Sequence, residues 1–314
     1  MAQSPSKQTK PMNTSSPKTT ALTTVMHGLM SRYQERVPDV MAIINVMISE
    51  GLIEKPEDIE NDHIAFRTLG VPHLGIASFE KIFLHYGYQK RDYYKFEGKK
   101  LDAFWFSPPE PHYPRIFVSE LRVGDLSEEA QRIIHSYTQE VTSDPVDSLN
   151  LDNGADVDNF LHQPLWRTPT LSDYLTLLKE SEYAAWVIYN RYYLNHFTIS
   201  VHNLHEGYNT VAEFNEFLEK RGFKLNDSGG KIKKSPDGGL LQSSTVAQMI
   251  EAEFANGETH TISGSYVEFA ERRVLPEFAD LPADQIQRKH RRDGFEAGNA
   301  DKIFESTYTS QTRK

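Results

Sequence analysis

Two histidines and two glutamates stand at similar places in the chain. His63 in NDHIAFRT and His196 in LNHFTIS each open a strand-like run. Glu120 in RIFVSEL and Glu268 in YVEFAER lie in later runs of the same kind. Two imidazoles with one carboxylate suit non-haem Fe(II), because they leave positions open for substrate and O2. The chain has no cysteine, so histidine and carboxylate are the strong ligand types left for a redox metal. Either glutamate is a candidate, and each histidine has an alternative role as a hydrogen-bonded structural residue.

Arg67 is a candidate for binding the substrate. Residues 63, 65 and 67 of a strand point to one face, so Arg67 lies on the side of His63, roughly 13 Å further along. A guanidinium there can bind a carboxylate through two parallel hydrogen bonds, away from a metal. The alternative is an interior ion pair with a glutamate. The polar residues 242–244 are expected to line the same cleft or to form a hydrogen-bonded strand edge. Competing side chains are His73, His202, His205 and Glu271.

The elements that must position these residues follow one pattern twice. Module one, residues 62–123, is predicted as a strand, a short amphipathic helix at 78–87 and three further strands. Module two, residues 195–273, repeats that order, with a helix at 210–223 and its next strand at 223–227. The repeat indicates an internal duplication of a βαβββ unit. Two such units bring the histidines and glutamates together if their strands curl around a shared cleft.

The rest of the chain is predicted to be mainly helical. Apolar residues recur at three- and four-residue spacing from residue 21 to 50, with a break at Pro38. A helical insertion at about 127–190 separates the modules and contains one long helix at 171–189. Within it, the Asp- and Asn-rich stretch 142–164 lacks periodicity, which favours a loop or a lid.

Composition limits the classes of function. The chain has 314 residues, with 34 Lys and Arg against 44 Asp and Glu, so its formal charge is −10. This acidic balance argues against a nucleic-acid partner, and no apolar run is long enough for a membrane span. Residues 1–24 are predicted to be a disordered tail and residues 25–314 a single catalytic domain. The tail has no secretory h-region, so a cytoplasmic location is expected, with a plastid as the alternative.

The runs NDHIAFRTLG, LNHFTIS, GGLLQSSTVA and GSYVEFAER resemble the 2-oxoadipate dioxygenase/decarboxylase family, a branch of the vicinal oxygen chelate superfamily. The spacing of His63 and Arg67 is the most specific part, and RRDGFEAGNADKIFEST extends the similarity toward the C-terminus. The resemblance implies an α+β fold in which two βαβββ modules form a curled mixed sheet around a metal cleft, with flanking helices. It also implies that His63, His196 and Glu268 bind Fe(II). Arg67, with His63, would contact the substrate, and all four residues would be catalytic.

The reaction implied by the resemblance converts 2-oxoadipate and O2 to (R)-2-hydroxyglutarate and CO2 in lysine catabolism. The partners are then a 2-oxo dicarboxylic acid and O2. Another enzyme of the same superfamily is the first alternative, either an extradiol dioxygenase or a glyoxalase-like isomerase with Glu120 as a fourth ligand. A non-catalytic small-molecule-binding module is the second.

Overall fold

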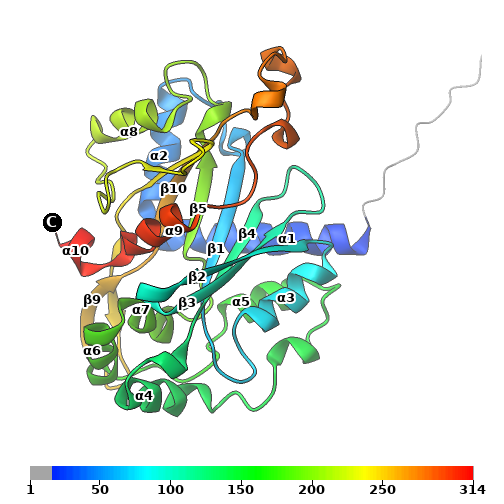
Figure 1. The fold of residues 1–314 in the computed structure, drawn as a ribbon. Helices are drawn as coiled ribbons and strands as arrows, with labels where there is room; N and C mark the ends of the chain where they lie inside the picture. Colours follow the sequence, from blue (N-terminus) through cyan, green and yellow to red (C-terminus); the bar gives the residue numbers. More distant parts are fainter. Residues whose placement is uncertain (1–15, 314) are drawn as a thin grey trace, which may run out of the picture.

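The computed structural model describes residues 16–313, which form one curled, eight-stranded mixed sheet, a separate hairpin and surrounding helices (Figure 1). The strands of the large sheet are β1 (Asn61–Leu69), β2 (Gln89–Phe96), β3 (Leu101–Ser107), β4 (Arg115–Leu121), β5 (His196–Ser200), β6 (Lys233–Lys234), β7 (Leu240–Ser244) and β10 (Tyr266–Arg272). The hairpin consists of β8 (Met249–Glu253) and β9 (Thr259–Ser263). The helices are α1 (Pro17–Arg36), α2 (Pro38–Ser49), α3 (Ile76–His85), α4 (Glu128–Thr138), α5 (Gly154–His162), α6 (Leu171–Glu180), α7 (Glu182–Asn190), α8 (Val211–Glu219), α9 (Ala297–Phe304) and α10 (Thr309–Thr312).

The strand order shows the predicted duplication directly. It is β2-β3-β4-β1-β5-β10-β7-β6, so module one forms one half of the sheet and module two the other. Within the halves, β4 runs parallel to β1 and β10 runs parallel to β5. The halves join through the antiparallel pair β1–β5, which brings the first strands of the two modules side by side at the centre. The predicted α+β architecture of two βαβββ modules is therefore present.

The sheet is curled, so its two edges approach the same helix. Helix α9 contacts β2 at one edge and β6 and β7 at the other, so it lies across the open side of the sheet (Figure 1). The central strands β1, β5 and β10 are buried along almost their whole length. Side chains on the concave face thus point into an interior closed by the C-terminal segment.

Helices α3 and α8 occupy the same place in the two modules, as the pattern predicted. Their apolar faces are buried, with Phe79 and Phe83 in α3 and Phe214 and Leu218 in α8. A glycine with positive φ follows each helix, at +88° for Gly87 and +85° for Gly222. Glycine adopts this left-handed conformation without steric cost and so ends a helix readily. Among residues 16–313, none of the helices combines the length and apolar character that a membrane span requires.

The predicted disordered tail is wrong for its last eight residues. Residues 17–24 form the first turns of α1, where Ser16 accepts a hydrogen bond from the amide of Thr19 and Pro17 stands at the first helical position. Ala21 and Leu22 are buried, and this burial offsets the cost of ordering the chain. Residues 1–15 of the predicted tail lie outside the described part of the chain.

Two predictions within the helical insertion are also wrong. The stretch 142–164 contains α5, which packs against α1 and buries Val157 and Phe160, so polar composition concealed a short amphipathic helix. The single helix predicted at 171–189 is two helices, because Ser181 has an extended backbone. Its hydroxyl accepts a hydrogen bond from the amide of Ala184 and thereby caps α7.

Module two departs from its prediction in its middle strands. The run 223–227 forms no strand of its own, and Leu225 makes a single bridge to Thr245. The edge strand beside β7 is the two-residue β6, which follows a turn at Gly229 and Gly230. The β8–β9 hairpin, which the sequence pattern did not reveal, is inserted before β10.

Candidate metal centre

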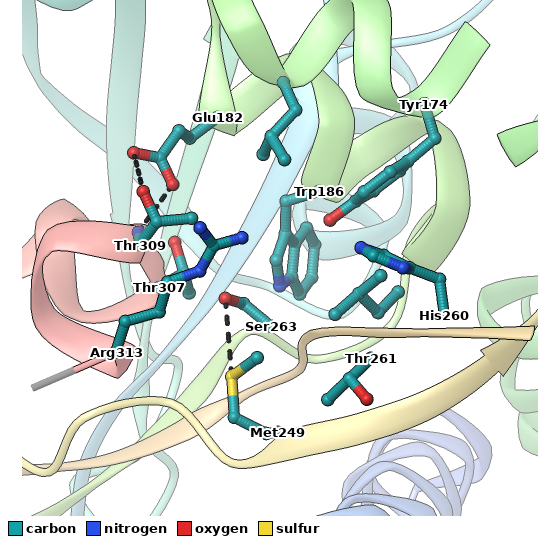
Figure 2. Close-up of a pocket in the computed structure, with 12 residues that line it drawn as sticks. Tyr174, Glu182, Trp186, Met249, His260, Thr261, Ser263, Thr307, Thr309 and Arg313 are labelled. Carbon is teal, nitrogen blue, oxygen red and sulfur yellow. Dashed lines mark hydrogen bonds between the residues drawn. The ribbon is translucent and has the colours of Figure 1, made fainter. Parts of the chain in front are cut away.

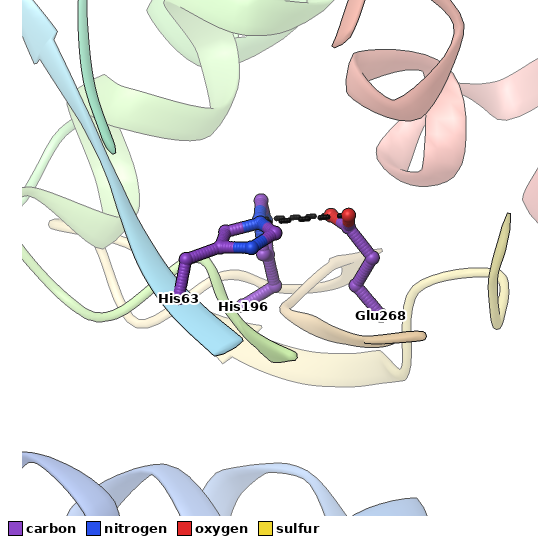
Figure 3. A group of neighbouring side chains, drawn as sticks. All are labelled: His63, His196 and Glu268. Atoms are coloured by element: carbon purple, nitrogen blue, oxygen red, sulfur yellow. Dashed lines mark ion pairs between the residues drawn. The ribbon is translucent and has the colours of Figure 1, made fainter. Parts of the chain in front are cut away.

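Three side chains from the centre of the sheet converge at one point (Figure 3). His63 comes from β1, His196 from the start of β5 and Glu268 from β10. The antiparallel pairing of β1 with β5 and the parallel pairing of β5 with β10 bring them onto the same face. Nε2 of His63 lies 3.4 Å from one carboxylate oxygen of Glu268, and Nε2 of His196 lies 3.0 Å from the other. One potential ligand atom from each residue lies within 4.8 Å of the others.

Burial shifts the pKa values of these three side chains. The exposed fractions of His63, His196 and Glu268 are 1%, 6% and 1%. Burial alone would raise the pKa of Glu268, but the two histidines outweigh it and hold that pKa well below its usual range. Burial lowers the pKa of His196, so its imidazole is neutral near neutral pH. Burial also opposes protonation of His63, but Glu268 and Asp62 raise the pKa of this residue. The negative environment that attracts a proton to His63 also attracts a metal cation.

The residue before each histidine orients its ring. Nδ1 of His63 lies 2.8 Å from the carboxylate of Asp62, and Nδ1 of His196 lies 3.1 Å from the side-chain oxygen of Asn195. Each Nδ1–H then donates to an oxygen, which leaves the lone pair of each Nε2 directed to the side of Glu268. Glu268 Oε2 is buried and accepts no hydrogen bond from residues 16–313. Two imidazole lone pairs and one ionised carboxylate, whose Oε2 has no hydrogen bond within that part of the chain, fit a divalent cation.

Asp62 is also the centre of a buried ionic network. Its two oxygens lie 2.6 and 2.9 Å from Nε and Nη2 of Arg272, and Arg115 Nη1 lies 3.1 Å from one of them. Burial would raise the pKa of Asp62, but these guanidinium groups hold it well below its usual range. Arg272 Nη1 donates to the carbonyl oxygens of Arg292 and Gly294. Asp62, whose carboxylate orients His63, is therefore connected through Arg272 to the C-terminal segment.

The carboxylate of Glu268 has its own support from β7 and α9. Gln242 Nε2 donates to Glu268 Oε1 over 2.6 Å, and Gln242 Oε1 accepts from Asn299 Nδ2 over 3.0 Å. This chain of amides fixes Glu268 with one oxygen engaged and the other free. Of the polar run predicted to line the cleft, Gln242 does so. Ser243 bonds to Asn215 of α8, and Ser244 bonds to Ser306.

A small cavity lies beside the three side chains. Its volume is about 20 Å³, room for one or two water molecules. Its apolar wall includes Phe117, Phe295 and Phe304, and its polar wall includes Gln242 and Tyr266. The ring of Phe295 packs edge-on against His63 with 4.8 Å between ring centroids. The interior beside the candidate ligands is therefore mostly apolar.

Arg67 is buried on the same strand as His63 and forms no ion pair with a carboxylate of residues 16–313. Its exposed fraction is 1%. Its Nη1 and Nη2 donate to Thr307 Oγ1 and to the Phe304 carbonyl, each over 2.9 Å, while Nε has no partner among the described residues. The rings of Tyr183 and Trp186 lie 5.2 Å from the guanidinium carbon. The predicted alternative of an interior ion pair is thus absent, and a buried cation without a counter-ion is costly.

The remaining candidates lie elsewhere. Glu120 accepts a hydrogen bond from the amide of Ile76 at the start of α3, so it is remote from the histidines and supplies no fourth ligand. Glu271 does the same for Val211 at the start of α8. His202 lies beyond the end of β5, beside the backbone of Arg272. His73 and His205 are exposed.

Sequence reasoning missed Asp62, Arg272 and Phe295. The first could have been found, because a side-chain oxygen acceptor precedes each histidine in NDH and LNH. Arg272 and Phe295 reach the site through contacts between distant segments and left no local signal.

Comparison with known proteins gives a consistent result. A family model described as 2-oxoadipate dioxygenase/decarboxylase matches residues 25–280. The chain is 48% identical over 261 residues to an Arabidopsis thaliana protein named "2-oxoadipate dioxygenase/decarboxylase, chloroplastic", covering 80% of this chain and 68% of that protein. It is also similar to a crystal structure of hydroxyglutarate synthase from Oryza sativa in complex with 2-oxoadipate. The TM-score is 0.86 and the identity 41%, with 100% of both chains covered.

A more distant structure supports the fold. A putative glyoxalase superfamily protein from Ralstonia eutropha JMP134 matches with a TM-score of 0.66 and 22% identity, covering 87% of this chain and 85% of that one. Together with the strand order, this likeness confirms the vicinal-oxygen-chelate-like fold that the sequence predicted.

Proposed function

Because the chain belongs to the 2-oxoadipate dioxygenase/decarboxylase family, we propose that it converts 2-oxoadipate and O2 to (R)-2-hydroxyglutarate and CO2 with the aid of Fe(II). The C1 carboxylate leaves as CO2. One oxygen atom of O2 enters the carboxylate formed from the keto carbon, and the other enters the new hydroxyl group. The equation balances without a further reductant, and its physiological place would be in lysine catabolism.

In this proposal His63, His196 and Glu268 hold the iron. When bound, Fe(II) supplies the redox chemistry that activates O2, which no amino-acid side chain of this site can supply. The protein contributes two oriented Nε2 atoms and a carboxylate whose position is fixed by Gln242. Asp62 holds the His63 ring through Nδ1 and increases its strength as a ligand.

The walls of the cavity would protect the reaction from water. Phe117 and Phe295 form part of the apolar wall of the cavity beside the candidate ligands. A dry site strengthens the electrostatic interactions between the protein and a charged substrate. A six-carbon acid is larger than the cavity, so we expect side chains of α9 to move aside when it binds.

One observation carries the assignment of a dicarboxylic substrate: a buried guanidinium without a counter-ion stands on the same strand face as a metal ligand. Arg67 can bind the distal carboxylate of 2-oxoadipate while the 2-oxo acid end lies at the iron. The unpartnered Nε–H of Arg67 supplies one donor for such a carboxylate. An analogue without the distal carboxylate would leave this buried charge unpaired, and the site should reject it strongly.

Oxygen uptake by the Fe(II)-reconstituted protein after addition of 2-oxoadipate tests the reaction. We expect uptake with the wild type, formation of one CO2 per O2, and no uptake with His63→Ala. Absence of uptake by a wild-type protein that holds iron would contradict the proposal.

The role of Arg67 requires a second comparison. We expect the wild type to prefer 2-oxoadipate over 2-oxohexanoate, which lacks the distal carboxylate, by a factor on the order of 10⁴ in kcat/KM. Arg67→Met should remove most of this preference through loss of activity on 2-oxoadipate. An unchanged preference in a folded, iron-loaded Arg67→Met protein would refute carboxylate recognition by Arg67.

We also propose that residues 25–314 act as one catalytic domain, because the candidate ligands and the cavity walls come from both modules and from the C-terminal segment. For the compartment, the name of the Arabidopsis relative favours the plastid alternative over the cytoplasm. Microscopy of the full chain fused at its C-terminus to a fluorescent protein would distinguish the two.

A further inference from the structure

A second cavity lies between helices α6 and α7, the β8–β9 hairpin and the C-terminal segment (Figure 2). Trp186 and Thr307 line it, with Thr309 and Arg313 further out. The indole of Trp186 and the hydroxyl of Thr307 are also two of the groups that contact the Arg67 guanidinium. The second cavity therefore ends at the side chains that hold Arg67 in place.

The metal-side cavity approaches Arg67 from the other direction. Phe304 and Tyr266 line that cavity, and the Phe304 carbonyl accepts a hydrogen bond from Arg67 Nη2. Within the part of the chain that the structure describes, neither the buried Tyr266 hydroxyl nor Arg67 Nε has a hydrogen-bond partner at a normal distance and angle. Arg67 thus stands in the partition between two cavities, with its unpartnered polar atom buried in that partition.

We propose that Thr307 is the positioning residue that sets the length of the dicarboxylic acid accepted by the site. This inference rests on the proposed function, because it takes Arg67 as the group that binds the distal carboxylate. The Thr307 hydroxyl holds Arg67 Nη1 and so fixes how far the guanidinium lies from the metal ligands. An acid with a longer carbon chain does not fit between the metal and a guanidinium fixed at this distance.

The second cavity, about 20 Å³ in volume, leaves room for a small shift of the guanidinium when Thr307 no longer holds it. Without the hydroxyl, Arg67 keeps the hydrogen bond from Nη2 to the Phe304 carbonyl but loses the one that holds Nη1. The long, flexible arginine side chain can then retreat toward Trp186, which lines the second cavity. The carboxylate-binding point moves away from the metal, and an acid with one more methylene fits better.

The test compares 2-oxoadipate with 2-oxopimelate, which is one methylene longer, in the wild type and Thr307→Val. Valine has the shape of threonine without the hydroxyl. We expect the kcat/KM ratio of 2-oxopimelate to 2-oxoadipate to rise about tenfold or more in Thr307→Val, mainly through the KM values. Thr307→Ser retains the hydroxyl and should restore the wild-type ratio.

Thr309→Val is the matched control. Thr309 lines the same cavity, but its amide and hydroxyl bond to Glu182 and not to Arg67. A rise of the ratio in Thr309→Val equal to that in Thr307→Val would show a general effect of the cavity wall and overturn the inference. An unchanged ratio in Thr307→Val would also overturn it.

Binding measurements keep the test independent of turnover. Anaerobic calorimetry with the metal-loaded protein gives the ratio of the dissociation constants of the two acids, and we expect the same shift. Thr307→Ala removes the same hydroxyl and serves as the second variant if Thr307→Val does not fold. A wild type inactive on 2-oxoadipate would refute the proposed function, whereas the inference on Thr307 fails on the variant ratio alone.

Discussion

The two modules place their strands in the same register and then use that register differently. Each histidine has a partner on the parallel strand beside it, on β4 in module one and on β10 in module two. Two residues beyond that partner stands Phe117 in module one and Glu268 in module two. Both side chains line the metal-side cavity. The duplicated fold provides two equivalent positions, and only one carries a ligand, so the opposite side of the centre is left to an apolar wall.

The residues before the histidines show the same contrast in charge. Asp62 and Asn195 each provide an oxygen to Nδ1 of the next residue, but only Asp62 is charged. Accordingly Asp62 helps to raise the pKa of His63, whereas burial lowers that of His196. With equivalent geometry, the charged partner makes His63 the stronger metal ligand, whereas His196 stays neutral.

The outer face of the sheet is the part that remained alike. Five residues beyond the partner of each histidine, Glu120 and Glu271 each accept a hydrogen bond from the first amide of the module's helix. A carboxylate there interacts favourably with the helix dipole. The symmetric counterpart of Glu120 is therefore Glu271, and the sequence comparison of Glu120 with Glu268 was wrong by three residues.

Of the two equivalent cavity positions, Phe117 and Glu268, only the second carries a metal-binding side chain. The largest effect should come from removing that side chain's charge. Glu268→Gln removes the carboxylate from the donor set, and we expect metal affinity to fall by more than about 100-fold, with loss of oxygen uptake. Glu120→Gln is the control and should leave metal affinity unchanged. Titration with Co(II) in competition with a chelator measures both. Wild-type affinity in Glu268→Gln would contradict the assignment of this residue.

Asp62→Asn makes module one resemble module two. We expect metal affinity to fall by about 10- to 100-fold, because the His63 ring loses its charged partner. The free energy of unfolding should fall by about 3 kcal/mol, because Arg115 and Arg272 keep buried charges without the carboxylate. Chelator competition and urea unfolding would measure the two effects. An affinity loss in Asn195→Ala as large as in Asp62→Asn would show that charge is not the difference.

The two modules should also differ in how their contribution to stability depends on pH. His202, after β5, stands at the position that Leu69 occupies at the end of β1. Burial, aided by the charge of Arg291, lowers the pKa of His202 to about 4. In the unfolded chain this side chain takes up a proton near pH 6.5. Between about pH 6.5 and 4 the unfolded state therefore binds a proton that the folded state does not, and stability falls as pH falls.

The contribution of His202 to this loss should reach about 3 kcal/mol by the low end of the window. His202→Gln should therefore show a shallower decline in the free energy of unfolding from pH 7 to pH 4.5. Urea unfolding at several pH values measures the slope. Parallel curves for the two proteins would mean that His202 titrates normally in the folded state.

The smallest effects should be equal in the two modules. Glu120→Gln and Glu271→Gln keep an acceptor for the helix amide but remove the charge, so each should lower the free energy of unfolding by about 0.5 kcal/mol. Thermal unfolding of both variants provides the comparison. A much larger loss in one module would show that the two glutamates do not play equivalent roles.

The sequence predicted the site where local pattern was sufficient. His63 and His196 were recognisable because each opens a run with strand periodicity in a repeated βαβββ unit. The choice between Glu120 and Glu268 depended on the register of β4 and β10 against neighbouring strands, which alternation within one strand does not reveal. Resemblance to a known family supplied that choice, and the structure places Glu268 beside the histidines.

Other features depended on contacts between distant segments. Phe295 packs against His63, 232 positions earlier in the chain, and no local pattern records such a contact. Helix α5 was missed because its apolar residues are few and its flanks are rich in Asp and Asn. The polar residues that made this stretch resemble a loop cap the helix, as Asn153 does, or face the solvent.

The contact between Arg272 and the carbonyls of Arg292 and Gly294 bears on how the protein is made. Residues emerge from the ribosome in order, so the three candidate ligands are synthesised before the segment that walls their cavity. A nascent chain that ends before residue 291 contains His63, His196 and Glu268 but lacks Phe295 and α9. Completion of the C-terminal segment is thus the step at which a protected site first exists.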